Sequence, residues 1–376
     1  MHNLHILSLQ NSDLNGELPS DLFAMSSLRE LYLSNNNFQG VLPDRWESLE
    51  GLEILSLAKN AFRGNLPESF GLAPKLRAIS LMDQVTKGGG LTGSVPSFSK
   101  SRSLTQLIVG ANKLDGTLPE DLLIAVDPLE SLFHVDITNN MISGTVHDGI
   151  GKARSLTELN VRYNKLNGDL PEELSKLVNL LTLDISHNKF SGPLPFWMKN
   201  LASLTSFTAS NNKLSGFVLD FASLSKLSYL DLSYNQFEGT VPPTLLASSP
   251  PDDKVVVNLS HNKIEGVVPA DLSRLYRLSI QLQENEISGI DEDLCKTDGV
   301  NDFDALSFGC NGILCPVGTW NSLGRQSNED VPCEPCKKAK FMGTTNCGGS
   351  SDSAISKKPT VILGLIFGVG ISWMML

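Results

Sequence analysis

Cysteine is missing from the first 294 residues of this chain, which separates a long cysteine-free body from a short tail. The six cysteines are Cys295, Cys310, Cys315, Cys333, Cys336 and Cys347. An even number of cysteines in a short segment rich in glycine and proline predicts disulfides, although their pairing cannot be read from the sequence. Bound zinc is the alternative. It is disfavoured because the tail holds a single C-x-x-C pair and no histidine follows His261.

Positive charge and recognisable chemistry are also scarce. Lys and Arg number 30 against 41 Asp and Glu, so the formal net charge is −11. This balance argues against a nucleic-acid partner, because phosphates need a basic surface. The six histidines are scattered, and the nucleophile elbow, phosphate loop, H-E-x-x-H motif and kinase signatures are missing. The sequence therefore predicts a protein that is not an enzyme and binds no metal or cofactor.

Leucine, in contrast, recurs at regular intervals. A common first position aligns Leu4, Leu28, Leu52, Leu76, Leu104, Leu132, Leu156, Leu180, Leu204 and Leu227, and looser copies start at Lys254 and Arg277. The shared pattern is L-x-x-L-x-L-x-x-N-x-L-x-G-x-L-P, and twelve copies can be placed. A period in the twenties is the signature of leucine-rich repeats.

Each part of the repeat has a physical role. The central Leu-x-Leu, such as Leu55 and Leu57, predicts a short strand with one buried face. Stacked copies form a parallel sheet and bury leucines that one coil leaves exposed. The Asn that follows can pair with backbone groups at the turn, which predicts a structural ladder. Ten copies carry it, at Asn36, Asn60, Asn112, Asn140, Asn164, Asn188, Asn212, Asn235, Asn262 and Asn285, while Ser12 and Gln84 take the remaining places.

The closing glycine and Leu-Pro, as in Gly168–Pro171, resemble the plant-type subclass of leucine-rich repeats. The resemblance covers roughly residues 1–290 and implies a second short strand in each coil and a superhelical twist. We therefore expect an α/β solenoid over residues 1–294. It would be a leucine-rich-repeat superhelix of about twelve coils with a parallel concave sheet.

Polar and aromatic residues occupy outward positions of the central strands. The candidates for a ligand-binding stripe on the concave face are Asp136, Asn160, Arg162, Tyr163, Asp184, Tyr229, Asp231 and Tyr234. Aspartates could recognise a peptide or glycan, and tyrosine and arginine are favoured at interfaces. The alternative is a solvated sheet face, because Leu-Asp-Leu-Ser is also the consensus of the repeat itself.

An insertion interrupts the fourth copy from Val85 to Gly90. Its glycine triplet predicts a flexible loop beside the concave sheet, where insertions often contribute to binding. A tolerated surface insertion is the simpler interpretation, because lengthening a loop costs little.

The two ends of the array differ. Residues 1–4 already lie in a repeat strand without a secretory signal or cap, which predicts a true start further upstream. A cytosolic protein with a bare first coil is the alternative. At the other end, Cys315–Thr319 and Pro332–Cys336 resemble the cysteine-rich modules of extracellular proteins, including the tails of plant-type receptor-like surface proteins. The resemblance predicts a disulfide-rich module over residues 295–347.

A hydrophobic, uncharged run of 17 residues, 360–376, closes the sequence and has the minimum length of a membrane span. The small and polar residues of 348–359 form a linker before it, which fits a GPI-attachment signal. A C-terminal transmembrane helix is the other possibility. Lys357 and Lys358 would favour the cytosol for that flank, against the disulfides, whereas a GPI signal is removed and avoids the conflict.

These features predict a membrane-anchored extracellular receptor-like protein without a catalytic domain. It would bind a peptide, glycan or protein ligand on its concave face, on the extracellular side of the plasma membrane. Signalling would need a co-receptor with a signalling domain. Two alternatives stay open: a structural adhesion or cell-wall-associated protein, and an inhibitor of secreted hydrolases.

Overall fold

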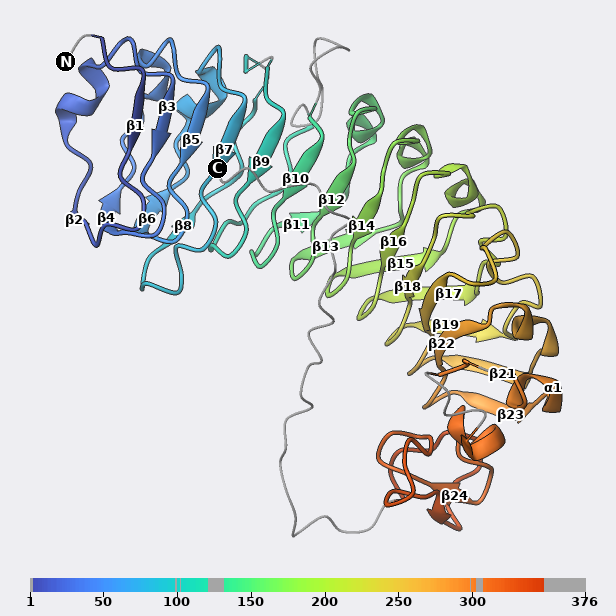
Figure 1. The fold of residues 1–376 in the computed structure, drawn as a ribbon. Helices are drawn as coiled ribbons and strands as arrows, with labels where there is room; N and C mark the ends of the chain where they lie inside the picture. Colours follow the sequence, from blue (N-terminus) through green and yellow to red (C-terminus); the bar gives the residue numbers. More distant parts are fainter. Residues whose placement is uncertain are drawn as a thin grey trace.

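The computed structural model describes residues 3–98, 100–101, 103–120, 132–297, 299–301 and 307–347. Stacked coils follow one another along a curved solenoid, and a small cysteine-rich module lies against its last coil (Figure 1). The 3-10 helices lie along the outer side of the arc and the long parallel sheet lies along the inner side (Figure 1).

Within the described ranges, the inner sheet has twelve parallel strands. They are β1 (Ile6–Ser8), β3 (Glu30–Tyr32), β5 (Ile54–Ser56), β7 (Ala78–Ser80), β9 (Gln106–Ile108), β10 (His134–Asp136), β12 (Glu158–Asn160), β14 (Thr182–Asp184), β16 (Ser206–Thr208), β18 (Tyr229–Asp231), β20 (Lys254–Asn258) and β22 (Arg277–Gln281). The predicted leucine-rich-repeat solenoid of about twelve coils with a parallel sheet is confirmed.

Where a coil turns away from the inner sheet, it forms a second short strand. These strands are β2 (Asn15–Gly16), β4 (Asn37–Val41), β6 (Ala61–Asn65), β8 (Gly90–Thr92), β11 (Ser143–Gly144), β13 (Lys165–Gly168), β15 (Lys189–Pro193), β17 (Lys213–Phe217), β19 (Gln236–Gly239), β21 (Lys263–Val268) and β23 (Glu286–Ile290). In the described part of the chain they make a four-stranded sheet, β2 to β8, and a seven-stranded sheet, β11 to β23. The second strand implied by the plant-type resemblance is therefore present.

Glycine recurs in these second strands for a steric reason. Gly239, for example, has a φ of +75°, which favours glycine. A Cβ there would also lie 2.5 Å from the ring of Phe217 in the preceding coil. The glycine therefore leaves room for the previous coil's outward side chain to lie across the strand.

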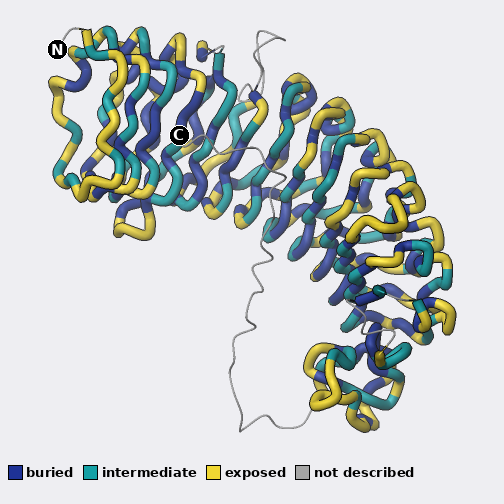
Figure 2. Tube along the Cα trace, viewed as in Figure 1, coloured by how far each residue is buried: buried dark blue, intermediate teal, exposed yellow. Residues whose placement is uncertain are grey.

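The outer side of the solenoid is closed by short 3-10 helices. They are η1 (Ser20–Ala24), η2 (Trp46–Ser48), η3 (Glu68–Leu72), η4 (Asp148–Lys152), η5 (Glu172–Lys176), η6 (Phe196–Asn200) and η7 (Ala270–Arg274). Buried residues recur from coil to coil along the whole array (Figure 2). The repeat leucines, such as Leu156 and Leu180, are fully buried, so one continuous core joins the coils.

The asparagine at the end of each inner strand ties neighbouring coils together. Asn188 Nδ2 donates to the carbonyls of Val161 (2.9 Å), Ile185 (3.2 Å) and Ser186 (3.1 Å), and its Oδ1 accepts from the N–H of Leu166 (2.9 Å). One amide thus satisfies backbone groups of two coils that would otherwise be buried without partners.

Gln84 forms the same bonds in the coil where Asn is replaced. Its Nε2 donates to the carbonyls of Leu57 (3.0 Å) and Leu81 (3.2 Å), and its Oε1 accepts from the N–H of Phe62 (3.1 Å). A side-chain amide, and not asparagine alone, can therefore make the ladder bonds.

The insertion in the fourth coil packs onto its neighbours. Lys87 Nζ donates to the carbonyl of Asn36 (2.7 Å) and to Asn37 Oδ1 (3.1 Å). A Cβ at Gly89 would lie 2.4 Å from the carbonyl oxygen of Phe62 and 2.5 Å from the carbonyl carbon of Ala61. Gly89 therefore allows two backbones to approach closely, a role that the expectation of a flexible loop had missed.

The cysteine-rich tail contains α1 (Glu292–Cys295), η8 (Gly309–Gly312) and the antiparallel pair β24 (Thr319–Trp320) and β25 (Glu334–Pro335). Three disulfides join Cys295 to Cys310, Cys315 to Cys333, and Cys336 to Cys347. The described ranges contain no free cysteine, and the predicted disulfide framework is confirmed.

This tail closes the end of the repeat core. The N–H of Glu284 donates to the carbonyl of Gly343 (3.3 Å), and that of Met342 to the carbonyl of Ile287 (2.9 Å). Met342 and Leu314 belong to the same buried cluster as the repeat leucines. The tail therefore covers apolar surface that a terminal coil would otherwise expose.

None of the helices in the described ranges combines the length and the hydrophobicity of a membrane span. The expected linker (348–359) and the expected membrane segment or GPI signal (360–376) lie outside the described residues.

Candidate functional site

The repeat places outward side chains of the inner sheet in straight rows. Parallel register aligns one row across six strands, from β10 to β20: Asp136, Asn160, Asp184, Thr208, Asp231 and Asn258. Neighbouring strands are about 4.8 Å apart, so side chains of adjacent coils are close enough to interact.

Local hydrogen bonds engage the aspartates of this row. Asp184 Oδ1 accepts from the N–H (2.9 Å) and hydroxyl (2.5 Å) of Ser186, and Asp231 Oδ1 accepts from the same groups of Ser233 (3.0 and 2.6 Å). Asp136 Oδ1 accepts from the N–H of Thr138 (2.9 Å). One oxygen of each carboxylate therefore closes the turn after its strand, which gives these residues a structural role beside any ligand contact.

A second row stands one position before the ladder asparagine. Its members share a left-handed backbone: Tyr163 (φ 53°), His187 (52°), Asn211 (57°), Tyr234 (53°) and His261 (55°). Equal backbone angles in successive coils project these side chains in parallel. The row therefore forms one edge of the inner surface.

Aromatic rings stack along this edge. The ring centroids of Tyr163 and His187 are 3.9 Å apart, and those of Tyr234 and His261 are 4.0 Å apart. The guanidinium of Arg162 lies 4.7 Å from the centroid of Tyr163, within cation–π range. The two stacks extend the polar row with flat, half-exposed surfaces of the kind that binding sites use.

The charged and aromatic groups of coils seven to ten influence one another. Burial lowers the pKa of His187, and Arg162 lowers it further, while Asp184 and Asp231 oppose this. Burial also raises the pKa of Asp231, and burial together with Asp231 and Asp184 raises that of Tyr229. These five residues therefore form one electrostatic cluster on the inner sheet.

The other expected residues lie at the margins of this cluster. Asp136 is two strands from Asp184 in the same row, with Asn160 between them. Tyr163 and Tyr234 stand in the edge row and are 41% and 51% exposed. The sequence interpretation had not included His187 and His261. Both histidines directly precede a ladder asparagine, as Tyr163 and Tyr234 do one coil earlier. This shared repeat position was the sequence signal that could have identified them.

Arg162 is the cation at the centre of this surface. Within the described ranges it forms no ion pair with a carboxylate, and its Nε has no hydrogen-bond partner. Among the described residues, the one polar contact of its side chain is a long bond from Nη2 to the Tyr163 hydroxyl (3.4 Å). A guanidinium without a carboxylate partner is available to an anionic or carbonyl group of a ligand.

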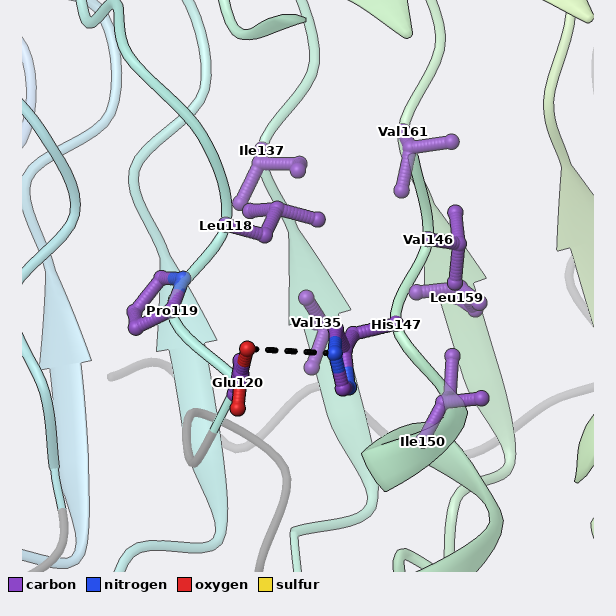
Figure 3. A pocket seen from close by; sticks show the side chains of 10 residues that line it. All are labelled: Leu118, Pro119, Glu120, Val135, Ile137, Val146, His147, Ile150, Leu159 and Val161. Atoms are coloured by element: carbon purple, nitrogen blue, oxygen red, sulfur yellow. Dashed lines mark ion pairs between the residues drawn. The ribbon is translucent and has the colours of Figure 1, made fainter. Parts of the chain in front are cut away.

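A small cavity of about 20 Å³ lies inside the solenoid, behind β10 and β12 (Figure 3). Val135, Ile137 and Leu159 are among its apolar lining residues, and an ion pair between His147 and Glu120 (3.2 Å) lies beside it. The volume equals about one water molecule, and the lining offers few polar partners. This is a packing gap rather than a ligand site. The described residues also contain no group of three or more His, Cys, Asp or Glu side chains placed to hold a metal.

Comparisons with known proteins agree with this geometry. Models of the leucine-rich-repeat family match residues 2–62 and 26–83, and again 155–177, 179–201 and 226–247. A comparison with curated proteins gave no match.

Among solved structures, one similar chain is the ectodomain of the Arabidopsis thaliana receptor kinase GASSHO1/SCHENGEN3, bound to CASPARIAN STRIP INTEGRITY FACTOR 2. It is 28% identical with a TM-score of 0.72, and the match covers 80% of this chain and 35% of that one. The Arabidopsis receptor kinase HAESA, bound to the peptide hormone IDA and the co-receptor SERK1, is 28% identical with a TM-score of 0.69, covering 77% and 47%. PEPR1 bound to AtPEP1 is 32% identical with a TM-score of 0.68, covering 76% and 39%. This chain therefore spans less than half of each receptor chain.

The fold and the matched repeats define a leucine-rich-repeat protein of the kind found in plant receptor-kinase ectodomains. More particularly, this chain resembles those ectodomains over its plant-type repeats, which end in a disulfide-bonded, cysteine-rich module. Domains of this kind bind ligands. The disulfides and the extracellular location of the similar ectodomains indicate an extracellular chain.

Proposed function

We propose that this chain is a receptor-like protein of the cell surface that binds an extended peptide along its inner sheet, between β10 and β20. The observation that carries this proposal is the cluster of Arg162, Asp184, His187, Tyr229 and Asp231 on the inner sheet, where Tyr229 is exposed and the other four are half-buried. The likeness to HAESA, which is in a complex with a peptide hormone, supports the choice of ligand class.

Each part of the surface has a distinct task in this proposal. The tyrosines offer flat contact area at low entropic cost, and Tyr163 and Tyr234 do so at the edge of the sheet. Arg162 donates hydrogen bonds to a carboxylate or carbonyl of the ligand. Asp184 and Asp231 attract cationic groups of the peptide, because a partly buried carboxylate is screened less than an exposed one.

Binding on this surface leads to no chemical reaction in the proposed mechanism. The chain would hold the peptide at the membrane through the anchor that residues 360–376 specify, and a co-receptor with a signalling domain would respond to the complex. HAESA, one of the similar proteins, is in a complex with a co-receptor as well as a peptide.

Selection from a peptide-display library against the secreted chain tests the proposal. Selected peptides should lose affinity for the variants Arg162→Ala and Tyr234→Ala, about tenfold or more for a central anchor residue. Tyr32→Ala, on β3 of the same sheet but outside the cluster, is the matched control and should bind normally. Equal losses of affinity in all three variants would contradict the proposal. So would selected peptides whose affinity none of the three substitutions changes.

A further inference from the structure

A row of lysines crosses the seven-stranded sheet, away from the inner sheet. Lys165, Lys189 and Lys213 are the first residues of β13, β15 and β17, and all three are exposed. These strands belong to consecutive coils and pair directly. Successive lysines are offset by two residues along their strands, so the row runs diagonally across the sheet with one positive charge about every 7–8 Å.

Among the described residues, no acidic side chain pairs in register with these lysines. The residues in register with them are neutral: Ser143 faces Lys165, Asn167 faces Lys189, and Ser191 faces Lys213. No residue of the described ranges forms an ion pair with any of the three lysines.

Two acidic residues, Glu238 and Asp169, lie close enough to be considered as partners of these lysines. Lys263 in β21, at the same repeat position, faces Glu238, so the uncompensated row stops before that coil. Asp169 follows β13, about 13 Å along the strand from Lys165, and its carboxylate lies beside Gly192 of β15, three residues beyond Lys189. The lysines thus form a local positive patch on a chain whose net charge is −11.

The same strands carry apolar residues at their other ends. Pro193 ends β15 and Phe217 ends β17, and Phe217 is 71% exposed. Its ring lies across Gly239 of the next coil, so it rests against the sheet. Serines occupy the middle of both strands, Ser191 and Ser215. Each strand thus offers a cation, a hydroxyl and an apolar group in line.

We propose that this lysine–phenylalanine face, formed by Lys165, Lys189, Lys213 and Phe217, binds an acidic polysaccharide. A polymer of uronic acids has one carboxylate on each sugar and can place a charge opposite each lysine. The negative face of an aromatic ring receives the C–H side of a sugar. Serine hydroxyls donate to and accept from sugar hydroxyls. This site is on a different sheet from the proposed peptide surface and does not depend on it.

The compartment in which the chain lies favours an acidic polysaccharide over other polyanions. The disulfides indicate an oxidising environment outside the cytosol. Anionic phospholipids are concentrated in the cytoplasmic leaflet, on the other side of the membrane.

The test uses the full chain, expressed with a secretion signal, and immobilised polygalacturonate. Binding should weaken about tenfold in the triple variant Lys165→Gln, Lys189→Gln, Lys213→Gln, the factor that three exposed ion pairs supply together. The matched control is Lys152→Gln, Lys199→Gln, Lys226→Gln, which makes the same charge change on other exposed surfaces and should bind like the wild type. Phe217→Ala should weaken binding without changing its salt dependence.

Three outcomes would overturn the proposal. The first is failure of the wild-type chain to bind polygalacturonate at low salt. The second is an equal loss in both triple variants, which would show a general charge effect. The third is equal binding to fully methyl-esterified polymer, which has no carboxylate charge, or to phosphatidylserine vesicles. Unchanged urea midpoints in both triple variants confirm that the substitutions act on binding and not on folding.

Discussion

At the scale of single residues, the ladder amide and the edge row perform different tasks in adjacent positions. Asn188 is turned inward and bonds to the backbones of two coils. His187, one residue earlier, has a left-handed backbone and points its ring along the edge, onto Tyr163. The repeat thus places a structural side chain and a surface side chain next to each other in every coil.

Asn188→Ala should lower the free energy of unfolding by about 1–3 kcal/mol, because backbone groups near it lose their partners. Urea titration of the secreted chain measures this change. Lys189→Ala, on the exposed face of the neighbouring strand, is the control and should change stability little. An unchanged midpoint for the asparagine variant would show that the ladder amide is dispensable.

The stacked histidines make stability depend on pH. Burial is the main cause that lowers the pKa of both His187 and His261 below the ordinary value of 6.5. The folded chain therefore binds fewer protons than the unfolded chain when the pH falls below 6.5, and stability is lost in that direction.

The double variant His187→Phe, His261→Phe should keep the stacks and lose this part of the pH dependence. Urea midpoints measured at a series of pH values above and below 6.5 would show a flatter profile than in the wild type. Parallel profiles for the two proteins would refute the assignment.

At the scale of elements, the second strands and the insertion depend on close approach between coils. Gly89 has no positive φ, so its backbone would accept alanine. The contact with Ala61 and Phe62 is what excludes a side chain. The insertion is therefore held against the array by Gly89 and by the hydrogen bonds of Lys87.

Gly89→Ala should destabilise the chain by about 1–3 kcal/mol through overpacking against backbone atoms. Gly289→Ala is the matched control, because its backbone is also ordinary and its nearest neighbour, Val267, would lie at 3.4 Å. That variant should be neutral or slightly stabilising. Thermal denaturation of both variants compares them, and equal behaviour would mean that the insertion can move away without cost.

At the scale of the whole molecule, the cysteine-rich tail finishes a core that is open at the end of a repeat array. The Cys295–Cys310 disulfide joins α1, next to the last coil, to η8. Replacing both cysteines with serine should cost about 2–5 kcal/mol of stability. Urea titration measures this loss of stability, and an unchanged midpoint would contradict a structural role.

Mass spectrometry after alkylation without reductant should find no modified cysteine in the wild type. Alkylated thiols would contradict the disulfides.

The proposed anchor also belongs to this scale. Expressed behind a working signal peptide, the chain should reach the cell surface and be released by a phosphatidylinositol-specific phospholipase, as a GPI signal in residues 360–376 requires. Resistance to the lipase with continued membrane binding would identify a transmembrane helix. Release by carbonate would contradict membrane anchoring altogether.

The sequence by itself determined the repeat architecture, the inner sheet and the oxidised state of the tail. The reason is that a coil is a local unit whose leucines and turn residues recur at a fixed period, as at Leu156 and Leu180. Each coil also packs on its neighbour in the same way, so one repeat predicts the next.

Only the tertiary structure decided which side chains of different coils meet. The stacking of Tyr163 on His187, the lysine row of the second sheet and the contact at Gly89 all join residues of separate coils. The disulfide pairing and the hydrogen bonds that engage Asp184 and Asp231 were decided in the same way. Composition and period do not specify these contacts, because they depend on the register, the backbone angles and the turn geometry of the folded coils.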